Sequence, residues 1–142
     1  MMQDSTSIIL FLGAILVFAG LLFAVIALTR KSPSGVNVEK YRSRWLTIEQ
    51  SLKKDEMSTY HMSVLHADTL LDQALKDKGI QGATMGERMK KMQTKWSNAN
   101  NVWTAHKLRN QIAHEPEVRL SYDSARRALG AFKQALKDVG AI

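Results

Sequence analysis

The sequence predicts an all-α protein, in which an N-terminal transmembrane helix precedes a small antiparallel helical bundle of four long helices and one short helix. Residues 8–29 form an apolar segment of 22 residues with no charge, amide or proline. Beyond this segment, apolar residues recur at three- and four-residue intervals, which is the spacing of one helix face. Alternation of polar and apolar residues never persists long enough to predict a strand.

Residues 8–29 are the predicted transmembrane helix, and residues 1–7 are a short external N-terminus. A helix of this length spans about 33 Å, which matches a hydrocarbon core of about 30 Å. A cleaved signal peptide fits less well, because residues 1–7 contain no Lys or Arg and no A-x-A-like site follows. All 20 Lys and Arg residues come after the span. The positive-inside rule therefore predicts a single-pass protein of the cell membrane, with its N-terminus outside and residues 30–142 cytoplasmic.

Residues 30–37 are the predicted linker, because Ser32-Pro33-Ser34-Gly35 favours a turn. Residues 38–142 form the predicted bundle domain, with helices expected over residues 38–54, 57–78, 84–94, 98–114 and 121–139. Thr84 and Glu87 have the spacing of a capping box, and Pro116 is expected to stop the helix before it. Ser121 is the expected N-cap of the last helix, and Gly140 its C′ residue.

The region after the span is strongly basic. It holds all 20 basic residues and 12 of the 13 acidic ones, so its formal net charge is +8. Such a charge suits RNA, DNA or the anionic inner leaflet as a partner. The alternative is a positive-inside bias with ordinary solubility charge. Cysteine is absent, which excludes disulfides, a thiol nucleophile and a cysteine zinc site within this sequence.

The densest polar cluster lies in the predicted helix 98–114. His106, Asn110 and His114 recur every four residues on one face, and Arg109 lies on the adjoining face. Histidine can move a proton to or from ribose oxygens near neutral pH. Arginine can bind a phosphate and stabilise negative charge that develops on it. This set of residues suits metal-independent RNA cleavage.

The segment Arg109-Asn110-Gln111-Ile112-Ala113-His114 resembles the R-x4–6-H motif of HEPN domains (higher eukaryotes and prokaryotes nucleotide-binding). The resemblance implies a helical bundle. Many members of this family are metal-independent ribonucleases, and their active cleft is shared by two protomers. By this resemblance, Arg109 binds phosphate, His114 is the acid or base and Asn110 supports them. The role of His106 is inferred from helix geometry instead. In the alternative interpretation, Arg109 and His114 cap the helix C-terminus.

A second basic cluster surrounds Met85, Met89, Met92 and Trp96, which share one helix face. Five residues are the candidate RNA- or anion-binding set: Arg88, Lys90, Lys91, Lys95 and Lys107. The apolar stripe suits a membrane surface, an RNA groove or a partner helix. A methionine stripe at this spacing is, however, more often part of a core.

The predicted partners are the lipid bilayer, RNA and a second copy of the chain, with an unidentified protein as a further partner. Gly20 and Ala24 form a small-xxx-small pair in the span, which favours helix pairing. His61 and His66 lack metal-ligand spacing, and no nucleotide-binding motif occurs, so no metal or cofactor is expected. The alternatives to a ribonuclease are a non-catalytic RNA- or protein-interaction module tethered to the membrane, or a structural membrane protein whose basic surface meets lipid headgroups.

Overall fold

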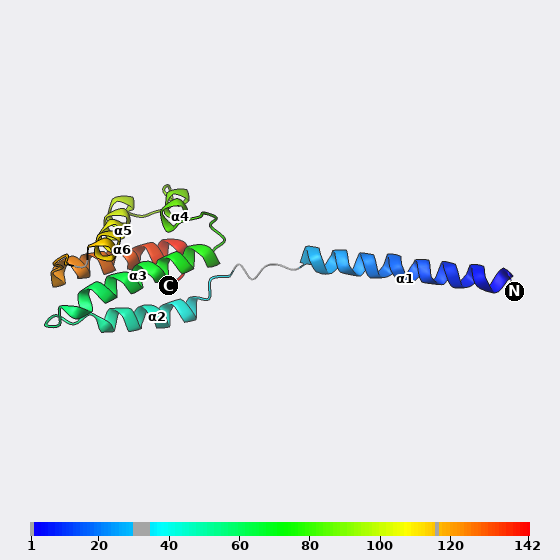
Figure 1. Cartoon of the computed structure of the whole chain (residues 1–142), viewed down its shortest axis with the longest axis horizontal. Helices are drawn as coiled ribbons and strands as arrows, with labels where there is room; N and C mark the ends of the chain where they lie inside the picture. The colour runs from blue at the N-terminus through cyan, green and yellow to red at the C-terminus, as the bar shows by residue number, and fades with distance from the viewer. Residues whose placement is uncertain (1, 30–34, 116) are drawn as a thin grey trace. The chain divides into compact units, whose positions relative to one another are not determined.

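The computed structural model describes residues 2–29, 35–115 and 117–142, which contain six α-helices and no strand (Figure 1). The helices are α1 (Met2–Thr29), α2 (Val38–Ser51), α3 (Ser58–Asp77), α4 (Met85–Lys91), α5 (Ala99–His114) and α6 (Tyr122–Val139). The predicted all-helical class is therefore confirmed for this part of the chain. Two compact units are present, Met1–Pro33 and Ser34–Ile142.

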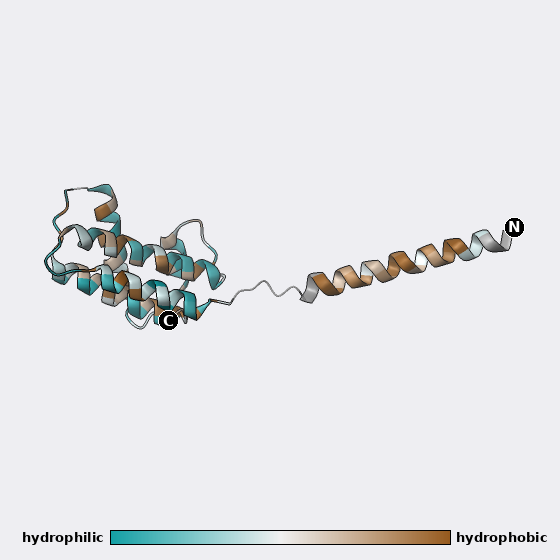
Figure 2. Cartoon of the chain, turned by 90° about the horizontal axis from the view of Figure 1, so that it is seen from below, coloured by the Kyte–Doolittle hydropathy of each residue, from teal (hydrophilic) through white to brown (hydrophobic). Residues whose placement is uncertain are grey.

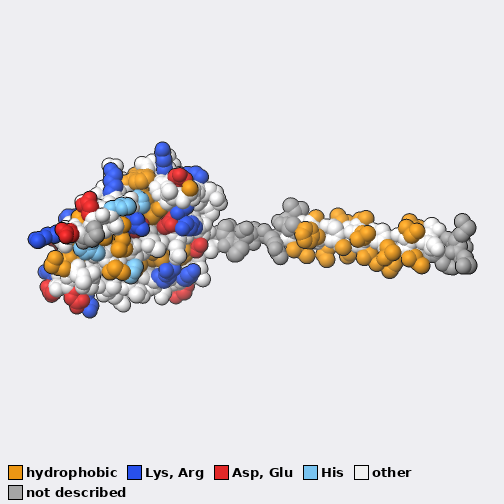
Figure 3. Space-filling view, viewed as in Figure 1, with side chains coloured by type: hydrophobic (Ala, Val, Ile, Leu, Met, Phe, Trp, Pro, Cys, Tyr) orange, Lys and Arg blue, Asp and Glu red, His pale blue; other side chains and the backbone are white. Residues whose placement is uncertain are grey.

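Helix α1 is apolar on all sides over most of its length (Figure 2). Its stretch Ser5–Ile26 is long and apolar enough to cross a membrane, and none of it is buried within the protein (Figure 3). The predicted span 8–29 overlaps this stretch. Residues 30–34 of the predicted linker lie outside the described residues.

Local capping explains where several helices begin and end. The Thr84 hydroxyl accepts a hydrogen bond from the Glu87 N–H at 3.2 Å. The Glu87 carboxylate accepts from the Ala83 N–H at 2.7 Å, one residue before the partner expected in a capping box. Ser121 caps α6 through the Ser124 N–H at 3.1 Å, and Gly140 ends it with φ 79°. These predicted caps are confirmed.

Two helices end three residues earlier than predicted, whereas the other bounds of α2 to α6 agree with the prediction within one residue. Helix α2 ends at Ser51 instead of residue 54, because the Thr59 hydroxyl accepts a hydrogen bond from the Lys53 N–H at 3.1 Å and replaces a helical acceptor. Helix α4 ends at Lys91 instead of residue 94, and turns follow it. Helix α5 ends at His114 as expected; Pro116 itself lies outside the described residues.

Helix α3 is the centre of the Ser34–Ile142 unit, since it contacts α2, α4, α5 and α6. Val64, Leu71 and Leu75 are fully buried on it and pack in one core with Tyr41 of α2 and Phe132 of α6. Every core residue lies between 36 and 142. This unit therefore has a hydrophobic core of its own, and it can be studied as a separate fragment.

Candidate functional site

A buried carboxylate joins α3 to the polar face of α5. Asp68 of α3 is 3% exposed. Its Oδ1 accepts a hydrogen bond from His106 Nδ1 at 2.8 Å, and its Oδ2 lies 3.2 Å from Arg109 Nε. This buried Arg109 Nε therefore has an ion-pair partner but no hydrogen-bond acceptor among the described residues. One carboxylate thus orients both an imidazole and a guanidinium.

Asn110 closes this network on α5. Its Nδ2 donates to His106 Nε2 at 3.3 Å, while its Oδ1 accepts from Arg109 Nη1 at 3.1 Å. Every bond is compatible with an imidazole that carries its proton on Nδ1, because Nε2 is then an acceptor. Asp68, His106, Arg109 and Asn110 consequently hold one another in fixed orientations. The structure brings together three of the four predicted catalytic residues.

The network lines a cleft of about 580 Å³ between α3, α5 and the start of α4. Thr69, Asp72, Thr84, Met85 and Gly86 complete its lining. The Arg109 side chain is 34% exposed, against 12% for His106. Arg109 is therefore the basic side chain in this cleft that an incoming phosphate can reach.

His114 does not line this cleft. It is the last residue of α5, its side chain is exposed, and no hydrogen bond or ion pair holds it in the described part of the chain. It lies five positions after Arg109, which corresponds to about 140° around a helix of 3.6 residues per turn. The sequence predicted that both side chains face one groove, and a single copy of the chain does not provide that groove.

Arg88 was predicted to bind anions, and the structure corrects this prediction. Arg88 is 6% exposed, and its Nε and Nη2 donate to Asp72 Oδ1 at 2.9 and 2.6 Å. Its Nη1 donates to the Gly82 carbonyl. Burial would raise the pKa of Asp72, but hydrogen bonds from Lys76 and Arg88 outweigh it and lower that pKa. Arg88 fastens α4 to α3 and is not available to an anion.

The other predicted anion-binding residues, Lys90, Lys91, Lys95 and Lys107, are exposed. Surface charges of both signs are interspersed on the face of the domain shown in Figure 3.

Met85, Met89, Met92 and Trp96 are at most 9% exposed, and the Trp96 indole N–H donates to the Met89 carbonyl at 3.0 Å. The methionine stripe is therefore core, which removes it as a membrane, RNA or partner surface.

Sequence reasoning missed Asp68, although a signal was present. Asp68 lies between Val64 and Leu71 at helical spacing, so it falls on the buried face of α3. A carboxylate on such a face requires a buried partner, because an unpaired buried charge is costly. Arg88 carried a similar signal, since it shares the helix face of Met85 and Met92.

The remaining histidines lie elsewhere. His61 Nε2 lies 2.8 Å from the Val118 carbonyl oxygen and ties α3 to the segment after α5, whereas His66 is exposed. Within the described residues, no three His, Asp or Glu side chains converge as a metal-binding set. No protein-family model, curated protein or solved structure matches the chain.

Proposed function

We propose that this protein is a membrane-anchored, dimeric, HEPN-like antiparallel helical bundle that binds RNA at α5 and cleaves it without a metal ion. Helix α1 is the anchor, with the N-terminus outside and the basic domain in the cytoplasm. One observation carries the proposal. Asp68 orients the partly exposed Arg109 of α5 at 3.2 Å, and α5 ends in an exposed His114 that forms no hydrogen bond or ion pair with any described residue.

The dimer follows from the directions of these two side chains. Arg109 belongs to the cleft, and His114 lies about 140° around α5 from it. A second copy can place its own α5 beside the first, so that each copy supplies one guanidinium and one imidazole to a shared site. The exposed Lys90, Lys91, Lys95 and Lys107 then provide further phosphate contacts.

The proposed RNA cleavage requires only imidazole and guanidinium side chains. One His114 takes the proton of a ribose 2′-hydroxyl, and the oxygen attacks the adjacent phosphorus. Arg109 stabilises the negative charge on the phosphorane. The second His114 protonates the departing 5′-oxygen, which breaks the P–O5′ bond. The products are a 2′,3′-cyclic phosphate and a 5′-hydroxyl. After the cyclic product leaves, the two histidines exchange a proton with water and return to their starting forms.

The test uses the full chain in detergent micelles with EDTA and a labelled single-stranded RNA. His114→Ala and Arg109→Ala should each lower cleavage by about 10²–10⁴-fold, the usual contribution of an acid–base or charge-stabilising group. His66→Ala is the matched control, because His66 is an exposed histidine of α3 and should leave the rate unchanged. Cleavage that survives both α5 substitutions, or that the wild-type chain never shows, refutes the nuclease.

One observation favours a second candidate, a non-catalytic RNA- or protein-interaction module. Asp68 engages both His106 and Arg109, so most polar groups of the cleft are satisfied within one chain. This candidate predicts RNA binding that never leads to a 2′,3′-cyclic product. The same assay therefore separates the two functions.

A further inference from the structure

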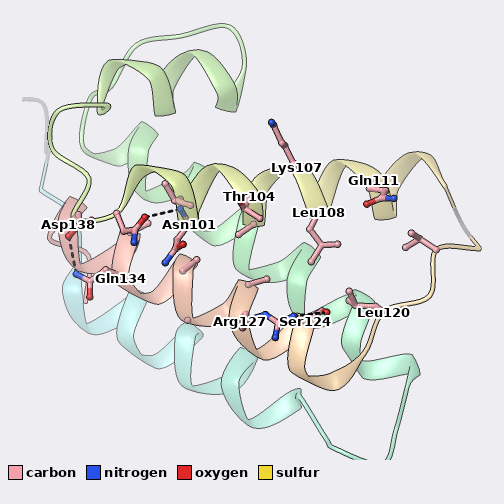
Figure 4. Close-up of a pocket in the computed structure, with 18 of the residues that line it drawn as sticks. Asn101, Thr104, Lys107, Leu108, Gln111, Leu120, Ser124, Arg127, Gln134 and Asp138 are labelled. Atoms are coloured by element: carbon pink, nitrogen blue, oxygen red, sulfur yellow. Dashed lines mark hydrogen bonds between the residues drawn. The ribbon is translucent and has the colours of Figure 1, made fainter.

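A second hollow lies on the other side of α5, between α5 and α6 (Figure 4). Its volume is about 790 Å³, and it shares no lining residue with the cleft of Asp68. Ser97 at the start of α5 binds Asp138 at the end of α6, with a Ser97 Oγ to Asp138 Oδ1 distance of 2.6 Å. The two helices therefore run in opposite directions, and the hollow is a groove between them.

The shape of the groove suits the binding of a third helix. On α6 it follows residues 124, 127, 128, 131, 134, 135 and 138, which form one stripe at helical spacing. This stripe is about 20 Å long. Ala128, Ala131 and Ala135 lie along it, and their small side chains allow a neighbouring helix to approach closely. Leu108 and Val118 add partly buried apolar surface from the opposite side.

Most of the charged side chains that line this groove are basic. Lys107, Arg119 and Arg127 are exposed basic side chains in its lining, and none forms an ion pair in the described part of the chain. Lys107 lies on the outer edge of α5 and points away from α6 (Figure 4). Asp138 is the one acidic residue of the lining, and it is already bound to Ser97 and Gln134.

We propose that the α5–α6 groove binds an acidic amphipathic helix of a partner protein. An apolar ridge on that helix would fill the alanine-lined floor, and its acidic flanks would pair with the three basic side chains. A second copy of the same groove would bring the same three cations and repel them. RNA fits less well, because no aromatic side chain in the lining offers a stacking surface for a base. The proposal uses none of the groups that carry out the proposed cleavage, although it shares Lys107 with the proposed phosphate contacts.

In the experiment, a displayed library of helical peptides of about 20 residues is selected for binding to the full chain in detergent micelles. Each peptide has a fixed Leu/Ala ridge, and its flanking positions vary among Glu, Gln and Lys. We expect selection to enrich Glu on the flanks. Arg127→Glu should weaken the selected peptides about tenfold or more, and Arg126→Glu by no more than about twofold. Arg126 is the matched control, because it is exposed on the same helix but outside the groove.

Three results would overturn the proposal. They are a selection without charge preference, peptide binding that Arg127→Glu leaves intact, and failure to select any peptide. A labelled single-stranded RNA is tested in parallel. Displacement of the RNA by the peptide, together with loss of RNA binding in Arg127→Glu, would assign the groove to RNA instead. None of these measurements depends on cleavage, so the nuclease and the groove can fail separately.

Discussion

Asp68 Oδ1 lies 2.8 Å from His106 Nδ1 and joins the central helix α3 to α5 beneath the candidate cleft. The same carboxylate holds Arg109 through its other oxygen at 3.2 Å. Asp68 is almost completely buried; it links two helices and sets the direction of the guanidinium.

Removal of this carboxylate should destabilise the domain. Asp68→Ala leaves His106 without its hydrogen-bond acceptor and Arg109 without its ion-pair partner, so we expect the free energy of unfolding of fragment 35–142 to fall by about 3–5 kcal/mol. Urea denaturation followed by circular dichroism measures this change. Asp55→Ala is the control, because Asp55 is exposed between α2 and α3 and should cost no more than about 0.5 kcal/mol. Equal, small effects of both substitutions would show that the Asp68 network contributes no stability.

Arg88 gives a second stability prediction. Arg88→Met breaks the buried pair with Asp72 and should lower the free energy of unfolding by about 3 kcal/mol. Lys90→Met, two residues away at an exposed position of α4, should change it by no more than about 0.5 kcal/mol. The same urea titration compares them. If Lys90→Met lowered the free energy of unfolding more than Arg88→Met, the interpretation that Arg88 holds α4 against α3 would be wrong.

The domain should lose stability in acid. The pKa values of Asp72 and Asp138 lie below the ordinary value of 3.8: burial acts to raise each, but hydrogen bonds from Arg88 and Lys76, and from Ser97 and Gln134, lower them. A depressed folded-state pKa means that the unfolded chain binds protons first as the pH falls. The contribution of these two carboxyls to the free energy of unfolding should therefore be nearly constant above about pH 5 and decrease below about pH 4.

Urea titrations of fragment 35–142 between neutral and acidic pH test this dependence. Asp138→Asn should make the acid loss shallower, because one of the two titrating carboxyls is then absent. A stability that rises on acidification would contradict the assignment of these two groups.

The orientation of α1 can be tested directly because the chain contains no cysteine. Gln3→Cys should react with a membrane-impermeant maleimide in intact cells. Thr94→Cys, at an exposed position after α4, should react only after the cells are permeabilised. The positive-inside rule is the physical reason, since every Lys and Arg follows the span. The reverse labelling pattern would place the basic domain outside.

Much of the fold was predictable because its determinants are local. The N-caps Thr84 and Ser121 and the C′ glycine Gly140 each act within a few residues of their own helix. The ends of α2 and α4 were less predictable, because Thr59 of α3 competes for the backbone after Ser51 and the turns after Lys91 contain no proline or glycine to signal them.

The site was predictable only in part, for a different reason. Helical spacing grouped His106, Asn110 and Arg109 correctly, since all three lie on one helix. Spacing on α5 alone could not reveal that Asp68, 38 residues before His106, orients this group. It also could not reveal that the cleft takes Arg109 and leaves His114 outside, because the cleft is formed by the packing of α3 and the start of α4 against α5.

The central claim is that Arg109 and His114 act together in a site shared by two copies of the chain. The most direct measurement is RNA cleavage by a mixed dimer in which one copy is wild type and the other carries His114→Ala. Because the proposed base and acid are the His114 side chains of different copies, the mixed dimer has only one of the two, and its cleavage should be about 10²–10⁴-fold slower than that of the wild-type dimer. A mixed dimer that keeps about half of the wild-type rate would show that each copy acts alone and would contradict the claim.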